Sequence, residues 1–141
     1  MRNQRTIVLV ACVKTKQPGK HAARDLYASD WFKKARAYAE RNGDAWFILS
    51  AEHGLLSPSE PIEPYEKTLK NMNKKEQMEW GARVLAKLRG ILAPSDRVIL
   101  LAGKAYVEPL IEGLRTVGVD VETPLRGMRS GEQKQWLKHN G

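Results

Sequence analysis

The residues best suited to chemistry follow a short apolar stretch near the middle of the chain. Phe47 to Leu49 read as a buried strand, and Ser50 to Gly54, "SAEHG", come directly after it. Glu52 and His53 carry the side-chain types that most often act as general acids and bases or position a water molecule. The simpler interpretation is a strand-end turn, in which Gly54 supplies a positive φ and His53 hydrogen-bonds a loop carbonyl.

A second candidate carboxylate, Asp25, lies upstream in the segment "ARDLYAS", together with Tyr27. The segment precedes the first predicted helix, so we expect both side chains to face the same edge of the fold as Glu52. The alternative is a local turn, or an ion pair between Asp25 and Arg24.

A proline-rich segment follows the central turn and ends at Tyr65. Pro58, Pro61 and Pro64 predict that Ser57 to Tyr65 form an ordered loop rather than a helix or a central strand. Prolines lower the entropic cost of holding a loop rigid, which suits the wall of a pocket. Alternatively, Tyr65 fills the core beneath the loop.

Basic residues flank these segments. Lys14 and Lys16 in "CVKTK", and Arg126 and Arg129 in "PLRGMRSGEQKQWLK", are candidates for phosphate contacts. The alternatives are solvated lysines and an amphipathic helix with Trp136 in the core.

Two further segments contain candidate binding residues. Gly103 and Tyr106 lie where a strand passes into a helix, and the backbone there could bind an anion, although one glycine is no dinucleotide-binding or P-loop motif. Cys12 has no neighbouring base in the sequence, which favours a small core residue over a nucleophile.

Alternating strands and helices must position these residues. Predicted strands span Thr6–Cys12, Ala45–Leu49, Arg97–Gly103 and Val119–Pro124. Helical spacing predicts a helix after each strand: one capped by Ser29 or Asp30, one capped by Asn73, one around Leu110, and a last one capped by Ser130. The helix capped by Asn73 is expected to carry its apolar residues on one face, namely Met78, Ala82, Leu85, Leu88 and Leu92. This order predicts an α/β fold with a parallel sheet covered on both faces. The carboxyl ends of its strands carry the candidate residues, where such sheets bind ligands.

Length and composition limit the classes of protein to which the chain can belong. The 141 residues predict a single domain over residues 1–141. The net charge of +8 is typical of a protein that binds nucleic acid, and the alternative is a surface that is basic only for solubility. The single cysteine, and the lack of a secretion signal or an apolar run long enough to cross a bilayer, predict a cytoplasmic protein with no membrane contact. No Cys/His cluster has metal-ligand spacing, so no metal is expected.

Five ordered blocks add a resemblance that covers nearly the whole chain: "ACVKTK", "ARDLYASDWFKKARAYAE", "WFILSAEHGLLSP", "EPYEKTL" and "PLRGMRSGEQKQWL". Together they resemble a small bacterial and phage domain family that is similar to the core domain of archaeosine synthase. The resemblance implies the uracil-DNA glycosylase-like fold, a three-layer sandwich with a four-stranded parallel sheet in the order 2-1-3-4. Some relatives are antiphage DNA glycosylases that remove glucosylated hydroxymethylcytosine from phage DNA.

The resemblance implies a DNA glycosylase that needs no cofactor and acts as a monomer on a flipped-out base. The chain lacks the "GQDPY" and "HPSPLS" motifs of uracil-DNA glycosylases, so roles are assigned from the strand edge alone. Asp25 first, and Glu52 second, would stabilise the oxocarbenium-like sugar or direct water, and His53 would hydrogen-bond the departing base. The expected substrate-binding residues are Cys12, Tyr27, Ser50, Tyr65, Gly103 and Tyr106, and the expected DNA-phosphate contacts are Lys14, Lys16, Arg126 and Arg129.

Two other functions fit the same residues. A non-enzymatic nucleic-acid-binding module would bind in a salt-dependent way without forming a product. An N-glycosidase of free nucleosides or nucleotides would not need the extended basic surface.

Overall fold

The computed structural model describes residues 4–11, 18–27, 29–65 and 69–141. Along the chain the elements are β1 (Thr6–Ala11), β2 (His21–Ala22), α1 (Ala23–Leu26), α2 (Asp30–Asn42), β3 (Ala45–Ser50), β4 (Gly54–Leu56), β5 (Pro61–Ile62), the 3-10 helix η1 (Leu69–Asn71), α3 (Lys74–Arg89), β6 (Arg97–Leu101), α4 (Lys104–Val117), β7 (Asp120–Glu122) and α5 (Ser130–Asn140). The predicted alternation of strands and helices is confirmed.

The main sheet has five strands in the order β4-β3-β1-β6-β7. The pairs β1–β3, β1–β6 and β6–β7 are parallel, whereas β4 pairs antiparallel with β3. The four-stranded prediction is therefore wrong for the sheet as a whole, because the chain turns back after Ser50 and adds β4 as an edge strand. The parallel strands lie in the order β3-β1-β6-β7, with β1 in the centre.

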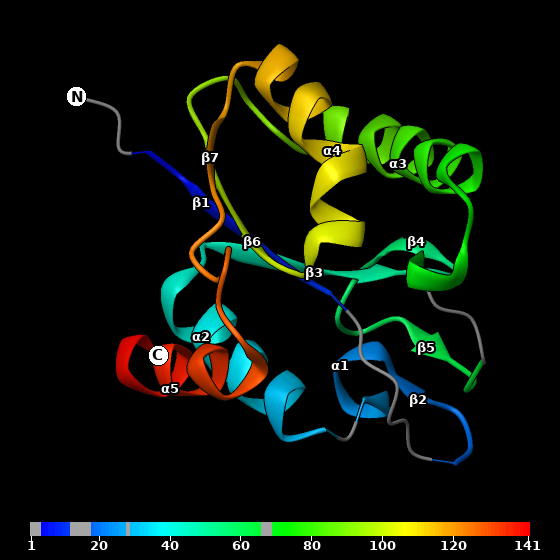
Figure 1. The fold of residues 1–141 in the computed structure, drawn as a ribbon, viewed down its shortest axis with the longest axis vertical. Helices are drawn as coiled ribbons and strands as arrows, with labels where there is room; N and C mark the ends of the chain where they lie inside the picture. The colour runs from blue at the N-terminus through cyan, green and yellow to red at the C-terminus, as the bar shows by residue number, and fades with distance from the viewer. Residues whose placement is uncertain (1–3, 12–17, 28, 66–68) are drawn as a thin grey trace.

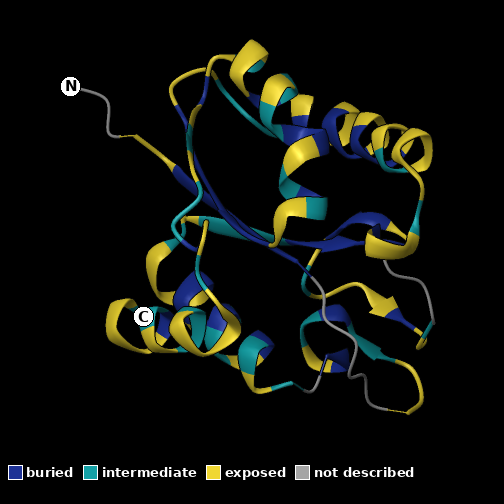
Figure 2. Cartoon of the chain, in the orientation of Figure 1, coloured by how far each residue is buried: buried dark blue, intermediate teal, exposed yellow. Residues whose placement is uncertain are grey.

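Helices cover both faces of this sheet, as the parallel strands require. Helices α3 and α4 pack together on one face, and α2 and α5 pack together on the other (Figure 1). Burial follows the same layers: the central strands β1 and β6 and the inward sides of the helices are mostly buried, and the outward sides of the helices are exposed (Figure 2). No helix in the described segments has both the length and the apolar character needed to cross a membrane.

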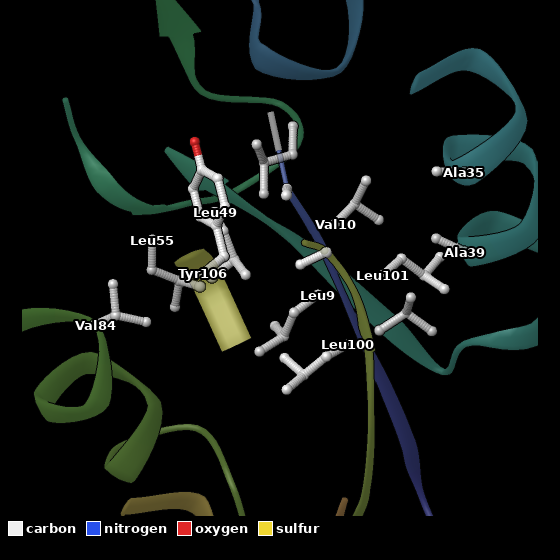
Figure 3. Close-up of a cluster of buried hydrophobic side chains, with 14 of the residues drawn as sticks. Leu9, Val10, Ala35, Ala39, Leu49, Leu55, Val84, Leu100, Leu101 and Tyr106 are labelled. Atoms are coloured by element: carbon white, nitrogen blue, oxygen red, sulfur yellow. The ribbon is translucent and has the colours of Figure 1, made fainter. Parts of the chain in front are cut away.

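Strand β1 is buried along its whole length, and its side chains alternate between the two layers. In Figure 3, Leu9 and its neighbour Leu100 face Val84 of α3 and Tyr106 of α4, whereas Val10 and Leu101 face α2. This pattern explains why the strand reads as a continuous apolar run rather than an alternating one.

Helix α3 uses a different face from the predicted one. The prediction placed Met78 and Ala82 inward, but Met78 is 50% exposed and Ala82 is also exposed. Trp80 and Val84 are buried instead, together with Leu85 and Leu88, which were predicted correctly. Trp80 buries more apolar area than Met78 would, so the face of α3 that carries Trp80 packs against the core.

The predicted helix starts are mostly confirmed. The Ser29 hydroxyl accepts from Phe32 N–H at 3.1 Å, and Asn73 and Glu76 form a reciprocal capping box. The prediction for α5 is wrong by one residue, because Arg129 is the N-cap and Ser130 is the first helical residue.

A small second sheet joins two segments that are far apart in sequence. Strands β2 and β5 pair antiparallel, and Ala23 N–H and Arg24 N–H donate to the carbonyls of Glu60 and Pro58 at 2.8 and 2.9 Å. Ser57 to Tyr65 therefore contain neither a helix nor a central strand, as predicted, and the short edge strand at Pro61–Ile62 is a feature that the prediction did not include. This pairing places α1 and the proline-rich segment together beside the carboxyl end of the main sheet (Figure 1).

Candidate functional site

The centre of the candidate site is the turn that ends β3. Ser50 is fully buried at the last position of the strand, and its hydroxyl accepts a hydrogen bond from His53 N–H at 3.1 Å. Gly54 has a φ of +74°, so the predicted positive-φ turn is confirmed. The turn reverses the chain into β4 and leaves Glu52 and His53 exposed at the carboxyl edge.

Three hydroxyl groups form a chain across this edge. The Tyr65 hydroxyl lies 2.7 Å from the Ser50 hydroxyl and 2.7 Å from the Tyr27 hydroxyl. We call Tyr27, Tyr65 and Ser50 the hydroxyl chain. It connects the end of β3, the proline-rich segment and the residue after α1, so three of the predicted substrate-binding residues lie together.

His53 lies beside this chain. Its imidazole ring packs edge-on against the Tyr65 ring, with 5.4 Å between the centroids and 86° between the planes. Ser50 therefore holds the backbone of His53, and Tyr65 contacts its ring. The exposed side of the imidazole remains available for a ligand at the edge.

Trp80 of α3 supports the same turn from within the core. It is fully buried, and its indole N–H donates to the Ser50 carbonyl at 2.8 Å. The ring also makes an edge contact with Tyr106 of α4, with centroids 5.5 Å apart. Tyr106, another predicted substrate-binding residue, is thus connected to Ser50 through Trp80. Trp80 is not among the residues predicted from the sequence, although Trp80, Val84 and Leu88 recur at the four-residue spacing of a helix face.

Asp25 lies on the exposed side of α1, where its carboxylate makes ion pairs. Arg36 Nη1 is 2.9 Å and Arg24 Nε is 3.8 Å from the two carboxylate oxygens. Burial by itself would lower the pKa of Arg36, but hydrogen bonds to Asp25 and Glu40 raise it above the ordinary value. The alternative predicted for Asp25, a pair with Arg24, is therefore present, and Arg36 is a closer partner that the sequence did not indicate.

The remaining predicted residues lie elsewhere or outside the described segments. Gly103 is exposed at the N-cap of α4 with an ordinary φ of −78°, so nothing in its backbone requires glycine. Arg126 and Arg129 are exposed in the turn after β7, and β7 is the parallel strand farthest from β3 in the sheet. Cys12, Lys14 and Lys16 fall outside the described residues. Among the residues that the structure describes, no cluster of three or more His, Cys, Asp or Glu side chains could hold a metal ion.

The arrangement can bind a polar ligand next to an imidazole. A fixed His53, a nearby Glu52 and a chain of hydroxyl groups can exchange or donate protons at the carboxyl edge of a parallel sheet.

Comparison with known proteins gives a family but no activity. A family model described as a family of unknown function (DUF6884) matches residues 7–139. No curated protein matches the chain.

Proposed function

Because the chain belongs to DUF6884, a family of unknown function, we propose its activity from its own residues: a DNA glycosylase that excises a modified base. The base is glucosylated 5-hydroxymethylcytosine in phage DNA, and the product is an abasic site. The observation that carries the proposal is the held imidazole of His53, which packs on Tyr65 at the end of the hydroxyl chain.

The fold is part of the same proposal. The parallel strands lie in the order β3-β1-β6-β7, which is the second, first, third and fourth of the parallel strands along the chain. That order agrees with the uracil-DNA glycosylase-like sheet, with β4 as an added edge strand. In such folds the ligand lies beyond the carboxyl ends of the central strands, where His53 and the hydroxyl chain are.

The reaction is hydrolysis of an N-glycosidic bond. Water adds to the anomeric carbon of the sugar, the bond from that carbon to the base nitrogen breaks, and its electron pair leaves with the base. His53 hydrogen-bonds the departing base and supplies the proton that neutralises it. Glu52 accepts the proton of the attacking water.

The carboxylate role goes to Glu52 in preference to Asp25. Asp25 lies on the exposed side of α1, where its carboxylate pairs with Arg36 of α2 at 2.9 Å. Glu52 adjoins His53 in the turn that Ser50 and Tyr65 hold. Asp25 and Arg36 then fix α1 on α2, so that Tyr27 reaches the hydroxyl chain.

The charge of the chain fits a DNA substrate. A net charge of +8 attracts the phosphate backbone, and a flipped-out base exposes its glycosidic bond to a site at a sheet edge. Of the two other functions considered above, the binding module has no use for a held imidazole next to a carboxylate. A hydrolase of free nucleosides has no need of a strongly basic surface.

An abasic-site assay tests the proposal. The protein is incubated with phage DNA that carries glucosylated hydroxymethylcytosine, and with the same DNA unmodified, and both are then treated with an abasic-site endonuclease. We expect strand breaks in the modified DNA alone. Tight binding without breaks in either DNA would instead favour the binding module.

A further inference from the structure

An open groove lies where the turn after β7 meets the start of α5. Its volume is about 740 Å³, and its lining residues are Met128, Arg129, Gly131, Glu132, Gln135 and Trp136. Ligand pockets in proteins span about 300–1,000 Å³, so the groove is large enough for an organic group of the size of a nucleobase.

The walls of the groove are held in place before any ligand binds. The Trp136 ring packs against Tyr38 of α2, with centroids 5.2 Å apart. The Gln133 side chain accepts from the Trp31 indole N–H at 2.8 Å and donates to the Met128 carbonyl at 2.9 Å. The turn, α5 and α2 are thus joined, which lowers the entropic cost of binding.

The charge around the groove complements phosphate. Arg126 and Arg129 are exposed in the turn that forms one of its sides. Between residues 123 and 140 the chain has four basic side chains and one acidic side chain, which are Arg126, Arg129, Lys134, Lys138 and Glu132. The net positive charge therefore favours an anionic partner at this surface, and a phosphate backbone is such a partner.

The residues that line the groove can also contact the base of a nucleotide. The partly exposed indole of Trp136 and the thioether of Met128 offer apolar surface for a planar base, and the exposed Gln135 amide can both donate and accept hydrogen bonds. Aromatic stacking next to basic side chains is the usual way in which proteins hold single strands.

We propose that this groove binds one unpaired base of single-stranded DNA, while Arg126 and Arg129 hold the adjoining phosphates. The inference rests on the proposed function for the class of partner. It adds a second contact to that of the His53 turn, because no residue that lines the groove belongs to that turn or to the hydroxyl chain.

Gly131 allows a sharp test. A Cβ at this position would meet no atom within 4 Å, so a larger side chain enters the groove without disturbing the backbone. Gly131→Leu fills the groove, and Gly131→Ala is the matched control that leaves it open. The affinity of each full-length variant is measured by fluorescence anisotropy with two labelled probes. One is a short mixed-sequence single-stranded DNA, and the other is an abasic sugar–phosphate chain of the same length.

We expect Gly131→Leu to weaken binding of the base-containing probe about fivefold or more, the equivalent of one stacked base, and to leave the abasic probe unaffected. Gly131→Ala should bind both probes like the wild type. Equal binding of the DNA probe by Gly131→Leu and wild type would overturn the inference, as would equal losses on both probes or binding of an acidic peptide in preference to DNA. These outcomes are separate from the glycosylase proposal, which is tested by whether the wild type forms abasic sites.

Discussion

The hydroxyl of Tyr65 lies 2.7 Å from the hydroxyl of Ser50, and this pair fastens the proline-rich segment to the end of β3. Ser50 is fully buried, so its hydroxyl must find partners within the protein, and Tyr65 and the backbone of His53 supply them. The residue that positions the candidate imidazole is thus held by a residue 15 positions further along the chain.

The effects of Tyr65→Phe and Ser50→Ala on the free energy of unfolding should be coupled. Each substitution removes the Tyr65–Ser50 hydrogen bond, whose net contribution is about 1 kcal/mol, so the double variant should lose less stability than the sum of the single variants. The free energy of unfolding of the four proteins in urea gives the coupling. Additive losses within error would mean that the bond does not contribute to stability.

Gly81→Ala should separate α3 from α4. A Cβ at Gly81 would lie 2.7 Å from both the Cβ and the carbonyl oxygen of Pro109, and backbone cannot move aside as a flexible side chain can. Overpacking of this kind costs about 1–3 kcal/mol, which urea unfolding measures. Gly131→Ala in open space is the control and should keep or slightly increase stability. An equal response of the two variants would contradict the close packing of these helices.

Alkaline destabilisation should depend partly on Tyr38. Burial raises the pKa of Tyr38 above its ordinary value of 10.0. Below pH 10 the phenol is neutral in both the folded and the unfolded chain. As the pH rises from there through the folded pKa, the unfolded chain loses the proton more readily and the folded state loses stability. Tyr38→Phe should therefore show a shallower fall in the free energy of unfolding as the pH rises above about 10. Parallel curves for the two proteins would exclude this contribution.

Phosphate binding by Arg126 and Arg129 should appear in the salt dependence of DNA affinity. On duplex DNA, removing one side chain that neutralises a phosphate reduces the slope of log K against log salt concentration by about 0.9. Arg126→Ala and Arg129→Ala should each show this change. Arg83→Ala removes the same charge from the exposed side of α3 and is the control. If all three variants change the slope equally, the effect comes from net charge rather than from phosphate binding in the turn.

The sequence predicts the layers of the fold well, because apolar runs such as Thr6–Ala11 and helix signals such as Ser29 and Asn73 are local. It misses β4 and β5, since strands of three and two residues depend on their partners rather than on their own pattern. The wrong face of α3 has a similar cause: Met78 and Trp80 both fit a helical stripe, and only packing against Ser50 and Tyr106 decides between them.

The candidate site is predictable only in part. The strand-edge rule finds Ser50 and His53, because it needs nothing more than the end of a strand. Tyr27 was found from its place just before the helix that begins at Asp30. The hydroxyl chain could not be predicted, since it joins residues that are 38 and 15 positions apart in the chain. The same holds for the Asp25–Arg36 pair, which links two separate helices.

The most direct measurement is the identity of what leaves the DNA. Mass spectrometry of the small molecules released from glucosylated phage DNA distinguishes a free base from a nucleotide or a sugar. We expect the wild type to release the free glucosylated base, and Glu52→Gln and His53→Gln to bind the same DNA with little or no release. Release of a nucleotide, of glucose alone, or of nothing from the wild type would contradict the glycosylase. Full release by both variants would contradict the roles of Glu52 and His53.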